Sequence, residues 1–248
     1  MQVVAVVNRR GGVGKTVTAH ALGAGLKQKG KKVLYIDLDS QMNLTYDTGA
    51  ENTEPTAMEM LTRQVSASET IAHTAQGDII PASAELSTAD IAITETGKEY
   101  RLKEAIDGLK YDFIIIDTPP ALGILTTNAL TAADRVIIPA QAEIHSLQGI
   151  GLLKDTLDAV RKYTNPKLRI DGILLTRYNS RAIISQDMRT DLEEMARQMQ
   201  TRVYDTPIRE CTAIKEAQAL QQDIFTYAPR SNAAKDYSMF ITQFTKSK

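Results

Sequence analysis

A glycine-rich segment near the start of the chain ends in a lysine and a hydroxyl residue, side chains suited to binding phosphate groups. Residues 8–16 read Asn-Arg-Arg-Gly-Gly-Val-Gly-Lys-Thr and follow an apolar run. The glycines let the backbone curl, so that several N–H groups point inward. Lys15 can place a full charge at the β- and γ-phosphates of a nucleotide, and the Thr16 hydroxyl can ligate Mg²⁺. The segment is therefore predicted to be a phosphate-binding loop.

Carboxylates follow two apolar runs farther along the chain. Asp37 and Asp39 close the run that begins at Val33, and alternate residues of an extended chain point the same way. Asp117 follows the four apolar residues 113–116, a pattern in which a buried strand delivers one carboxylate toward a metal-bound water. The carboxyl ends of parallel strands face the ligand crevice, so all three are expected beside the loop. The alternative for Asp37 and Asp39 is a pair of strand-end caps.

Short Val- and Ile-rich runs alternate with longer helical patterns, which predicts parallel strands joined by helical crossovers. Strands are predicted at residues 3–7, 33–38, 78–81, 113–116, 135–138, 170–176 and 202–204. Helices are predicted at residues 14–29, 99–109, 146–163, 181–200 and 232–244. Residues 45–74 are polar and weakly periodic. The expected fold is α/β, a P-loop NTPase with a mostly parallel twisted sheet and helices on both faces. Residues 1–248 are expected to form one such three-layer domain.

The composition limits the remaining classes. The 248 residues are 43% hydrophobic and 24% charged, with a net charge of −1, so contact with nucleic acid must come from a local patch. Trp is absent, which argues against a stacking platform for single strands. Cys211 has no second cysteine to pair with, and no run approaches the roughly 20 apolar residues that cross a bilayer. A cytoplasmic protein is expected.

The loop resembles the deviant Walker A motif, K-G-G-x-G-K-[ST], of the ParA/MinD family of P-loop ATPases. The resemblance implies that the first lysine reaches across a dimer to the partner's nucleotide, and this chain has Arg10 there. Arginine keeps the charge but is planar and bulkier, which changes the geometry of that contact. Val17 stands where the family usually has a second threonine. The implied nucleotide-binding residues of this loop are Gly11, Gly12, Val13, Gly14, Lys15, Thr16 and Val17.

The segment Asp-Leu-Asp-Ser-Gln-Met-Asn at residues 37–43 resembles the family motif D-x-D-P-Q-x-N. By that resemblance Asp39 orients or activates the attacking water, and Asp37 lies near the Mg²⁺ shell. The implied metal residues are Thr16, Asp37 and Asp117, and the implied catalytic residues are Lys15, Asp39 and Arg10. The Asp-Thr-Pro-Pro sequence at residues 117–120 resembles the loop that senses the γ-phosphate. The resemblance thus implies ATP and Mg²⁺ as cofactors.

Two later segments carry weaker resemblances. Residues 174–179 resemble the family's strand end near the nucleotide base, which nominates Arg177, and residues 206–209 resemble a loop over adenine, which nominates Pro207. Both fit equally an ordinary strand end and turn. MinD-type relatives end in a basic amphipathic membrane helix. Here the tail from Met239 is interpreted as the last turns of a core-packed helix, so membrane binding is not expected.

The leading hypothesis is a small ParA-like ATPase of plasmid or chromosome partitioning, since no helix-turn-helix precedes the first strand. The resemblance implies an ATP-dependent homodimer, nonspecific double-stranded DNA, a ParB-like partner and a nucleoid location when DNA is bound. Candidate phosphate contacts form two clusters. They are Lys27, Lys29, Lys31 and Lys32, and Arg209, Lys215, Arg230, Lys235, Lys246 and Lys248. The alternatives are a MinD-like membrane-positioning ATPase, a metabolic P-loop ligase or kinase, and a nucleotide-binding regulator with weak hydrolysis.

Overall fold

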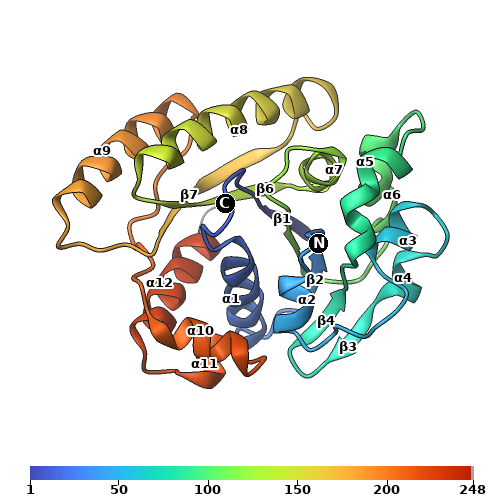
Figure 1. The fold of residues 1–248 in the computed structure, drawn as a ribbon, viewed down its shortest axis with the longest axis horizontal. Helices are drawn as coiled ribbons and strands as arrows, with labels where there is room; N and C mark the ends of the chain where they lie inside the picture. The colour runs from blue at the N-terminus through green and yellow to red at the C-terminus, as the bar shows by residue number, and fades with distance from the viewer. Residues whose placement is uncertain (247–248) are drawn as a thin grey trace.

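The structure, a computed structural model, describes residues 1–246, apart from the side chains of residues 144, 145, 183 and 184. Its centre is a seven-stranded twisted sheet in the order β3-β4-β2-β5-β1-β6-β7 (Figure 1). The edge strand β3 is antiparallel to β4, and the other neighbours are parallel. The strands are β1 (Gln2–Val6), β2 (Val33–Asp37), β3 (Ala72–Thr74), β4 (Gly77–Ile80), β5 (Phe113–Asp117), β6 (Arg135–Gln141) and β7 (Arg169–Thr176).

Helices cover both faces of the sheet, which gives the predicted three layers (Figure 1). The longer helices are α1 (Lys15–Gln28), α7 (Ile124–Ala132), α8 (Ile144–Tyr163), α9 (Ile183–Gln198), α10 (Thr212–Ala219) and α12 (Asn232–Lys246). The short ones are α2 (Asn43–Asp47), α3 (Ala57–Leu61), α4 (Ala67–Thr70), α5 (Ala89–Ala92), α6 (Arg101–Ala105) and α11 (Ile224–Tyr227). Two 3₁₀ turns, η1 (Ala84–Thr88) and η2 (Lys98–Tyr100), precede α5 and α6.

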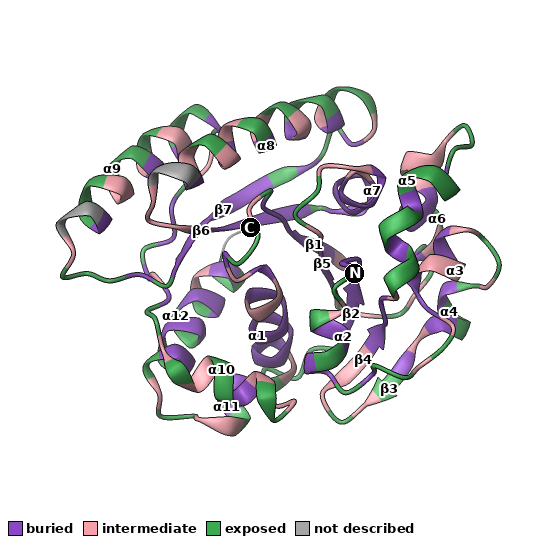
Figure 2. Ribbon diagram, viewed as in Figure 1, coloured by how far each residue is buried: buried purple, intermediate pink, exposed green. Residues whose placement is uncertain are grey.

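The alternation of side chains along the strands builds two cores, one on each face of the sheet. Val3 and Ala5 of β1 join the core under α6, α7, α8 and α9, whereas Val4 and Val6 join the core under α1, α10, α11 and α12. The central strands are buried on both faces (Figure 2). This is why they read as continuous apolar runs in the sequence.

The register of the three central strands brings the chemistry-bearing residues to one edge. Asp37 of β2 and Val6 of β1 both pair with Asp117 of β5, so the three strands end side by side. The loop that follows β1 therefore begins next to both carboxylates. The Thr118 hydroxyl also donates to the Val6 carbonyl at 2.9 Å, which ties the loop after β5 to the end of β1.

Several elements differ from the expectations. The strand predicted at residues 202–204 is a single bridge between Val203 and Ile173, because the chain bends at residues 205–206 and next pairs where Arg209 meets Tyr178. The helix predicted at residues 99–109 is η2 followed by the short α6. Residues 45–74 contain short helices and the edge strand, and α7 and α10 were not predicted.

The C-terminal helix follows the prediction. Phe240, Ile241 and Phe244 of α12 are each at most 1% exposed and pack against α1 and the sheet, so its apolar stripe is buried in the core. No helix in residues 1–246 combines the length and apolar character that a membrane span requires.

Candidate nucleotide-binding site

The predicted phosphate loop joins β1 to α1 as a tight curl, and side chains at the ends of β6 and β7 hydrogen-bond to its backbone. Gly12 and Gly14 have φ angles of 74° and 84°, which residues with a Cβ rarely adopt. From β6, the Gln141 side-chain amide donates to the Gly12 carbonyl at 3.0 Å. From β7, the Thr176 hydroxyl donates to the carbonyl of the buried Val13 at 2.8 Å. The curl is therefore fixed without any ligand.

Helix α1 begins directly after the curl and leaves its first N–H groups free. No side chain caps it, and its first turn holds no acid, so the positive end of the helix dipole faces the loop. Lys15 is 7% exposed, and its ammonium donates to the Arg10 carbonyl at 3.1 Å. Burial lowers the pKa of Lys15, while Asp117 and Asp39 act in the opposite direction. The arrangement suits an anion.

Asp37 is wholly buried, and both of its oxygens have partners within the chain. They accept hydrogen bonds from the Thr45 N–H and hydroxyl, each at 2.8 Å, and from the Asp39 N–H at 3.0 Å. Loss of hydration raises the pKa of Asp37 to about 6, and these hydrogen bonds lower it in part. The strand ends at Asp37, so Asp39 lies on the following turn and not one step further along an extended strand. The contacts of Asp37 therefore match the alternative of a strand-end cap, because its carboxylate accepts hydrogen bonds from backbone N–H groups that follow β2.

Asp117 differs from Asp37 because one of its oxygens has no partner. Its Oδ1 accepts from the Thr118 N–H at 3.1 Å, whereas its buried Oδ2 has none among the described residues. Burial raises the pKa of Asp117 well above its usual range, nearby Asp37 adds to this, and Thr16 and Lys15 oppose it. A buried carboxylate oxygen without a partner calls for a cation or a proton.

The donor set fits magnesium bound together with a phosphate better than an all-protein metal cage. In residues 1–246, outside the four undescribed side chains, no group of three or more His, Cys, Asp and Glu is placed to hold a metal. Mg²⁺ commonly keeps several waters and takes one or two protein ligands plus phosphate oxygens. The Thr16 hydroxyl and the free oxygen of Asp117 would provide such a partial set.

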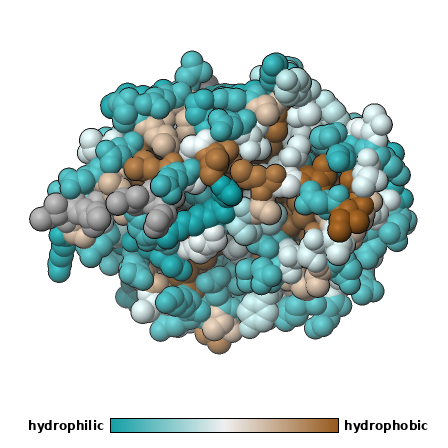
Figure 3. Space-filling model, turned by 45° about the horizontal axis from the view of Figure 1, so that its top comes forward, coloured by the Kyte–Doolittle hydropathy of each residue, from teal (hydrophilic) through white to brown (hydrophobic). Residues whose placement is uncertain are grey.

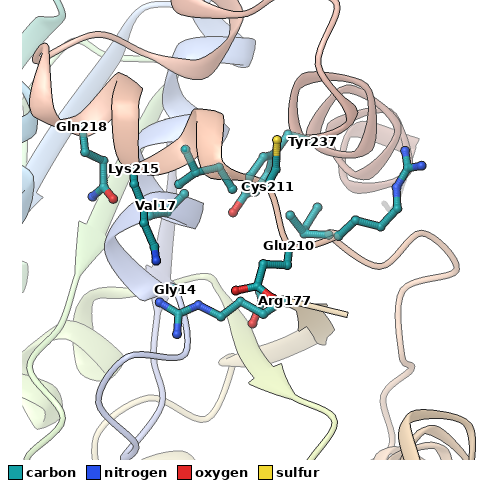
Figure 4. A pocket seen from close by; sticks show the side chains of 12 residues that line it. Gly14, Val17, Arg177, Glu210, Cys211, Lys215, Gln218 and Tyr237 are labelled. Carbon is teal, nitrogen blue, oxygen red and sulfur yellow. The ribbon is translucent and has the colours of Figure 1, made fainter. Parts of the chain in front are cut away.

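Two adjoining cavities extend from the loop. The first, of about 860 Å³ counting its open mouth, is lined by Gly11, Gly12, Lys15, Thr16, Asp39, Gln41, Asn43 and Pro120. The second, of about 490 Å³ also counting its open mouth, lies at the end of β7 (Figure 4). Its apolar side is made by Ile208, Ile214 and Tyr237. Gly14, Val17, Arg177 and Gln218 line both. Together they make a trough with a phosphate end and a base end.

Of the two residues that the sequence nominated for the base end, one lines the trough and the other does not. Arg177 lines both cavities, whereas Pro207 is not among the described lining residues, which begin one position later at Ile208. Sequence reasoning did not find Glu210, Ile214 or Gln218. Their signal is weak because Glu210 is an ordinary loop residue, and Ile214 and Gln218 are ordinary residues at ordinary helical spacing on α10.

Backbone strain also marks the trough. Among residues 1–246, five non-glycine residues have positive φ, and Arg63, Gln200 and Gln221 each directly follow the C-cap of a helix, where this conformation is common. The other two are Met42, between the lining residues Gln41 and Asn43, and Arg177, after β7. Positive φ that no helix C-terminus explains is thus confined, among the described residues, to the two walls of the trough, a distribution typical of ligand sites.

Arg10 is held within its own chain. Its guanidinium forms an ion pair of 2.6 Å with Glu143, the residue that precedes α8, and its Nη1 is buried without a partner among the described residues. The side chains are 32% and 46% exposed. Sequence reasoning placed Arg10 at the nucleotide of a partner and did not identify Glu143.

The structure separates the candidate DNA contacts. Arg209 donates to both carboxylate oxygens of Asp236, at 2.9 and 2.6 Å, and Lys215 lines the base end of the trough. Lys27, Lys31 and Lys32 instead line an open pocket with Lys110 near the C-terminal end of α1. Lys248 lies outside the described residues. On the face shown in Figure 3, hydrophilic side chains are interspersed with hydrophobic ones.

Comparisons with known proteins agree with this geometry. A family model described as an AAA domain matches residues 1–170. The chain is 39% identical over 243 residues to the sporulation initiation inhibitor protein Soj of Bacillus subtilis, with 95% of each chain covered. It is 34% identical over 246 residues to the chromosome partitioning protein ParA of Caulobacter vibrioides, with 96% of this chain and 91% of ParA covered.

Among solved structures, one of Mycobacterium smegmatis named cobyrinic acid a,c-diamide synthase, with bound ADP and magnesium, superposes with a TM-score of 0.85. The two are 34% identical, and the match covers 99% of this chain and 94% of the other. The predicted fold is thereby confirmed. The chain belongs to the family of P-loop ATPases that includes Soj and ParA.

Proposed function

We propose that this protein is a ParA-like partitioning ATPase that binds ATP with Mg²⁺ and forms a homodimer when ATP is bound. In that state it holds double-stranded DNA nonspecifically, and a ParB-like partner stimulates hydrolysis and release. The proposal rests on one observation: Lys15, Thr16 and Asp39 line a single cavity, with the buried Asp117 near enough to act on the charge of Lys15. The names of the relatives and the ADP and magnesium in the M. smegmatis structure support it.

Each residue has a proposed task. The N–H groups of residues 11–16 and the Lys15 ammonium bind the β- and γ-phosphates and stabilise the charge of the transition state. Thr16 and Asp117 would hold Mg²⁺, with Asp37 behind them, and the bound ion supplies neutralisation of phosphate charge. Asp39 orients the attacking water, and its carboxylate is positioned by the Gln41 N–H at 3.1 Å. Arg10 bridges to the nucleotide of the second subunit.

The same proposal includes organisation and location. Residues 1–248 act as a single ATPase domain in the cytoplasm, at the nucleoid while DNA is bound. The burial of Phe240, Ile241 and Phe244 in the core argues against a MinD-like membrane helix, because that helix would need its apolar face free. Sedimentation with anionic liposomes, with and without ATP, tests this point: ATP-dependent pelleting would favour the membrane alternative.

The central experiment measures DNA binding with ADP, ATP and ATPγS across a salt series. The proposal expects binding to a random-sequence duplex with ATP and ATPγS, little binding with ADP, and a steep loss of affinity with salt. Lys15→Ala serves as the control, since it keeps the surface charge distribution almost unchanged and should remove the nucleotide dependence. Binding that is the same with all three nucleotides would contradict the proposal.

The name of the M. smegmatis structure favours a second candidate, an ATP-dependent synthase with a small-molecule acceptor. Both candidates use the same phosphate end. They differ in what accelerates turnover, so ATP hydrolysis is measured with cobyrinic acid and, separately, with DNA plus a ParB-like protein. Stimulation by cobyrinic acid alone would favour the synthase.

A further inference from the structure

Two cationic side chains border the base end of the trough from opposite walls. Arg177 extends from the end of β7, and Lys215 extends from α10 (Figure 4). In that view the Lys215 side chain runs down toward the start of α1, and the Arg177 side chain reaches across the same opening beside Gly14. The two come from segments almost forty residues apart; Arg177 lines both cavities, and Lys215 lines the second.

Neither cation is neutralised within the described part of the chain. Arg177 and Lys215 make no ion pair and no side-chain hydrogen bond there, whereas Arg209 on the same lining is paired with Asp236. Glu210 is the one acid among the described lining residues, and it forms no ion pair with either cation. With the positive end of α1 beside them, the two cations leave this point short of negative charge.

The scaffold holds both cations in place. The Tyr178 N–H donates to the Ile208 carbonyl at 3.0 Å, which fixes the chain immediately after the strained Arg177, whose φ is 47°. Helix α10 is tied to α2 and the residues after it, because the Gln218 amide donates to Asp47 at 2.9 Å and, just beyond the end of α10, the Gln221 amide donates to Glu51 at 2.8 Å. Lys215 is therefore carried on a helix that is anchored to α2.

We infer that Arg177 and Lys215 clamp the α-phosphate of the bound nucleotide from two sides, within the subunit that binds it. The inference rests on the proposed ATPase function and assigns these residues to the phosphate chain instead of the base or the DNA. The β- and γ-phosphates belong to Lys15 and the loop, at the other end of the trough. The apolar side made by Ile208, Ile214 and Tyr237 suits a base. The α-phosphate is the group that lies between them, at the junction that Gly14 and Val17 share.

The test compares nucleotides that differ only in their phosphates. Wild type, Arg177→Gln, Lys215→Gln and the control Lys103→Gln are titrated with N-methylanthraniloyl-ADP, which is then displaced by adenosine, AMP, ADP and ATP. Lys103 is an exposed lysine on α6, away from the trough, so its variant matches the loss of charge. Glutamine keeps most of the side-chain length and removes only the cation.

Because the cations are exposed, each trough variant should lower the affinity for AMP, ADP and ATP by the same factor, roughly 5-fold. Adenosine should be unaffected, the Lys103→Gln control should match wild type, and the salt dependence of ADP binding should become shallower in both trough variants. An equal loss of affinity for adenosine would overturn the inference and indicate contacts with the base. A loss of affinity seen with ATP but not with AMP or ADP would also overturn it. If both variants bind AMP and ADP like wild type, the clamp does not exist.

The failures of the two proposals are distinguishable. Wild-type protein that does not bind N-methylanthraniloyl-ADP would overturn the proposed ATPase function and the clamp with it. Normal nucleotide binding by wild type and both variants would overturn the clamp alone. If Lys215→Gln binds ADP normally but loses affinity for DNA, Lys215 is a DNA contact, and the clamp is also contradicted.

Discussion

The two ends of the trough are built in opposite ways. At the phosphate end, Lys15, Asp37 and Asp117 are buried, and partners within the chain already hold the Asp37 carboxylate and the loop carbonyls of Gly12 and Val13. At the base end, Arg177, Glu210 and Lys215 are exposed, come from segments distant in sequence and make no ion pairs in the described residues. The phosphate end is preorganised, and the base end has polar groups still to be satisfied.

This difference separates two contributions to function. Groups that are fixed before the ligand arrives cost no reorganisation during the reaction, so they act on the rate. Exposed groups that gain their partner from the ligand act mainly on affinity. We therefore expect changes at the phosphate end to reduce turnover far more than binding, and changes at the base end to do the reverse.

The largest expected effect follows from Lys15→Ala. Lys15 is the one buried cation among the described residues that line the phosphate end, so removing its ammonium should reduce hydrolysis by on the order of 100- to 1,000-fold or more. Phosphate release measures it. Lys32→Ala, an exposed lysine beyond the other end of α1, is the matched control and should keep the wild-type rate. If Lys15→Ala hydrolyses ATP at more than a tenth of the wild-type rate, the role assigned to Lys15 at the phosphate end is wrong.

Asp39→Ala should separate turnover from binding most clearly. The carboxylate proposed to orient water is lost, which costs roughly 100- to 10,000-fold in rate. ATP should still bind, because the loop, Lys15 and Thr16 remain, so the variant should accumulate as an ATP-bound dimer in size-exclusion chromatography. Undiminished hydrolysis would refute the role of Asp39. Loss of ATP binding would show that the two ends are not separable in this way.

The phosphate end could be predicted from the sequence because its geometry is local. Gly12, Gly14, Lys15 and Thr16 lie within five residues, and Asp37 and Asp117 each end an apolar run. Once the strands are parallel neighbours, strand ends that carry acids meet at one edge. What the sequence could not supply was the state of Asp37. The contact with Thr45, eight residues on, depends on how the chain turns back after Met42.

The base end could be predicted only in part. Arg177 was nominated because residues 174–179 resemble the family's strand end near the nucleotide base, but Lys215 was assigned to DNA as one of many scattered basic residues. Its place in the trough depends on α10 packing beside α1 and on side-chain contacts such as that between Gln218 and Asp47. Such long-range contacts leave no pattern in the local sequence. For the same reason, the ion pair between Arg10 and Glu143 was not foreseen.

Asp47 links the two ends and gives a test of intermediate size. It is 2% exposed on α2 and accepts its hydrogen bond from Gln218 of α10. Loss of hydration raises the pKa of Asp47 from 3.8 to about 6, and the bond from Gln218 opposes this. The folded protein therefore holds a proton that the unfolded chain releases, so this group makes stability fall as pH rises from about 4 to 6.

Asp47→Asn keeps an acceptor for Gln218 and removes the buried charge. At pH 7.5 the free energy of unfolding should rise by roughly 2–3 kcal/mol. The gain should fade as the pH is lowered toward 4, where the carboxyl is protonated in both states. Urea titrations at several pH values measure it, with Asp107→Asn at an exposed position as control. Asp37, whose pKa is also about 6, remains in both proteins and cancels in the comparison. A loss of stability at pH 7.5 would mean that the charge of Asp47 is needed.

The smallest effect concerns Glu143, which sits at the outer margin of the phosphate end. If Arg10 bridges to the nucleotide of a second subunit, its ion pair with Glu143 must open first, and a partly exposed pair of this kind contributes about 0–1 kcal/mol. Glu143→Gln should therefore lower the protein concentration at which half of the ATP-bound chains are dimeric, by up to about 5-fold. Analytical ultracentrifugation with ATPγS measures it.

The double variant Arg10→Ala with Glu143→Gln decides whether the effect passes through Arg10. If Glu143 acts only by retaining Arg10, then adding Glu143→Gln to Arg10→Ala changes nothing, and the two substitutions are not additive. Weaker dimerisation of Glu143→Gln would instead mean that the carboxylate itself is needed in the dimer. The preorganised phosphate end would then include Glu143, a residue whose partner lies in the second subunit, just as the partners of the base-end cations come with the ligand.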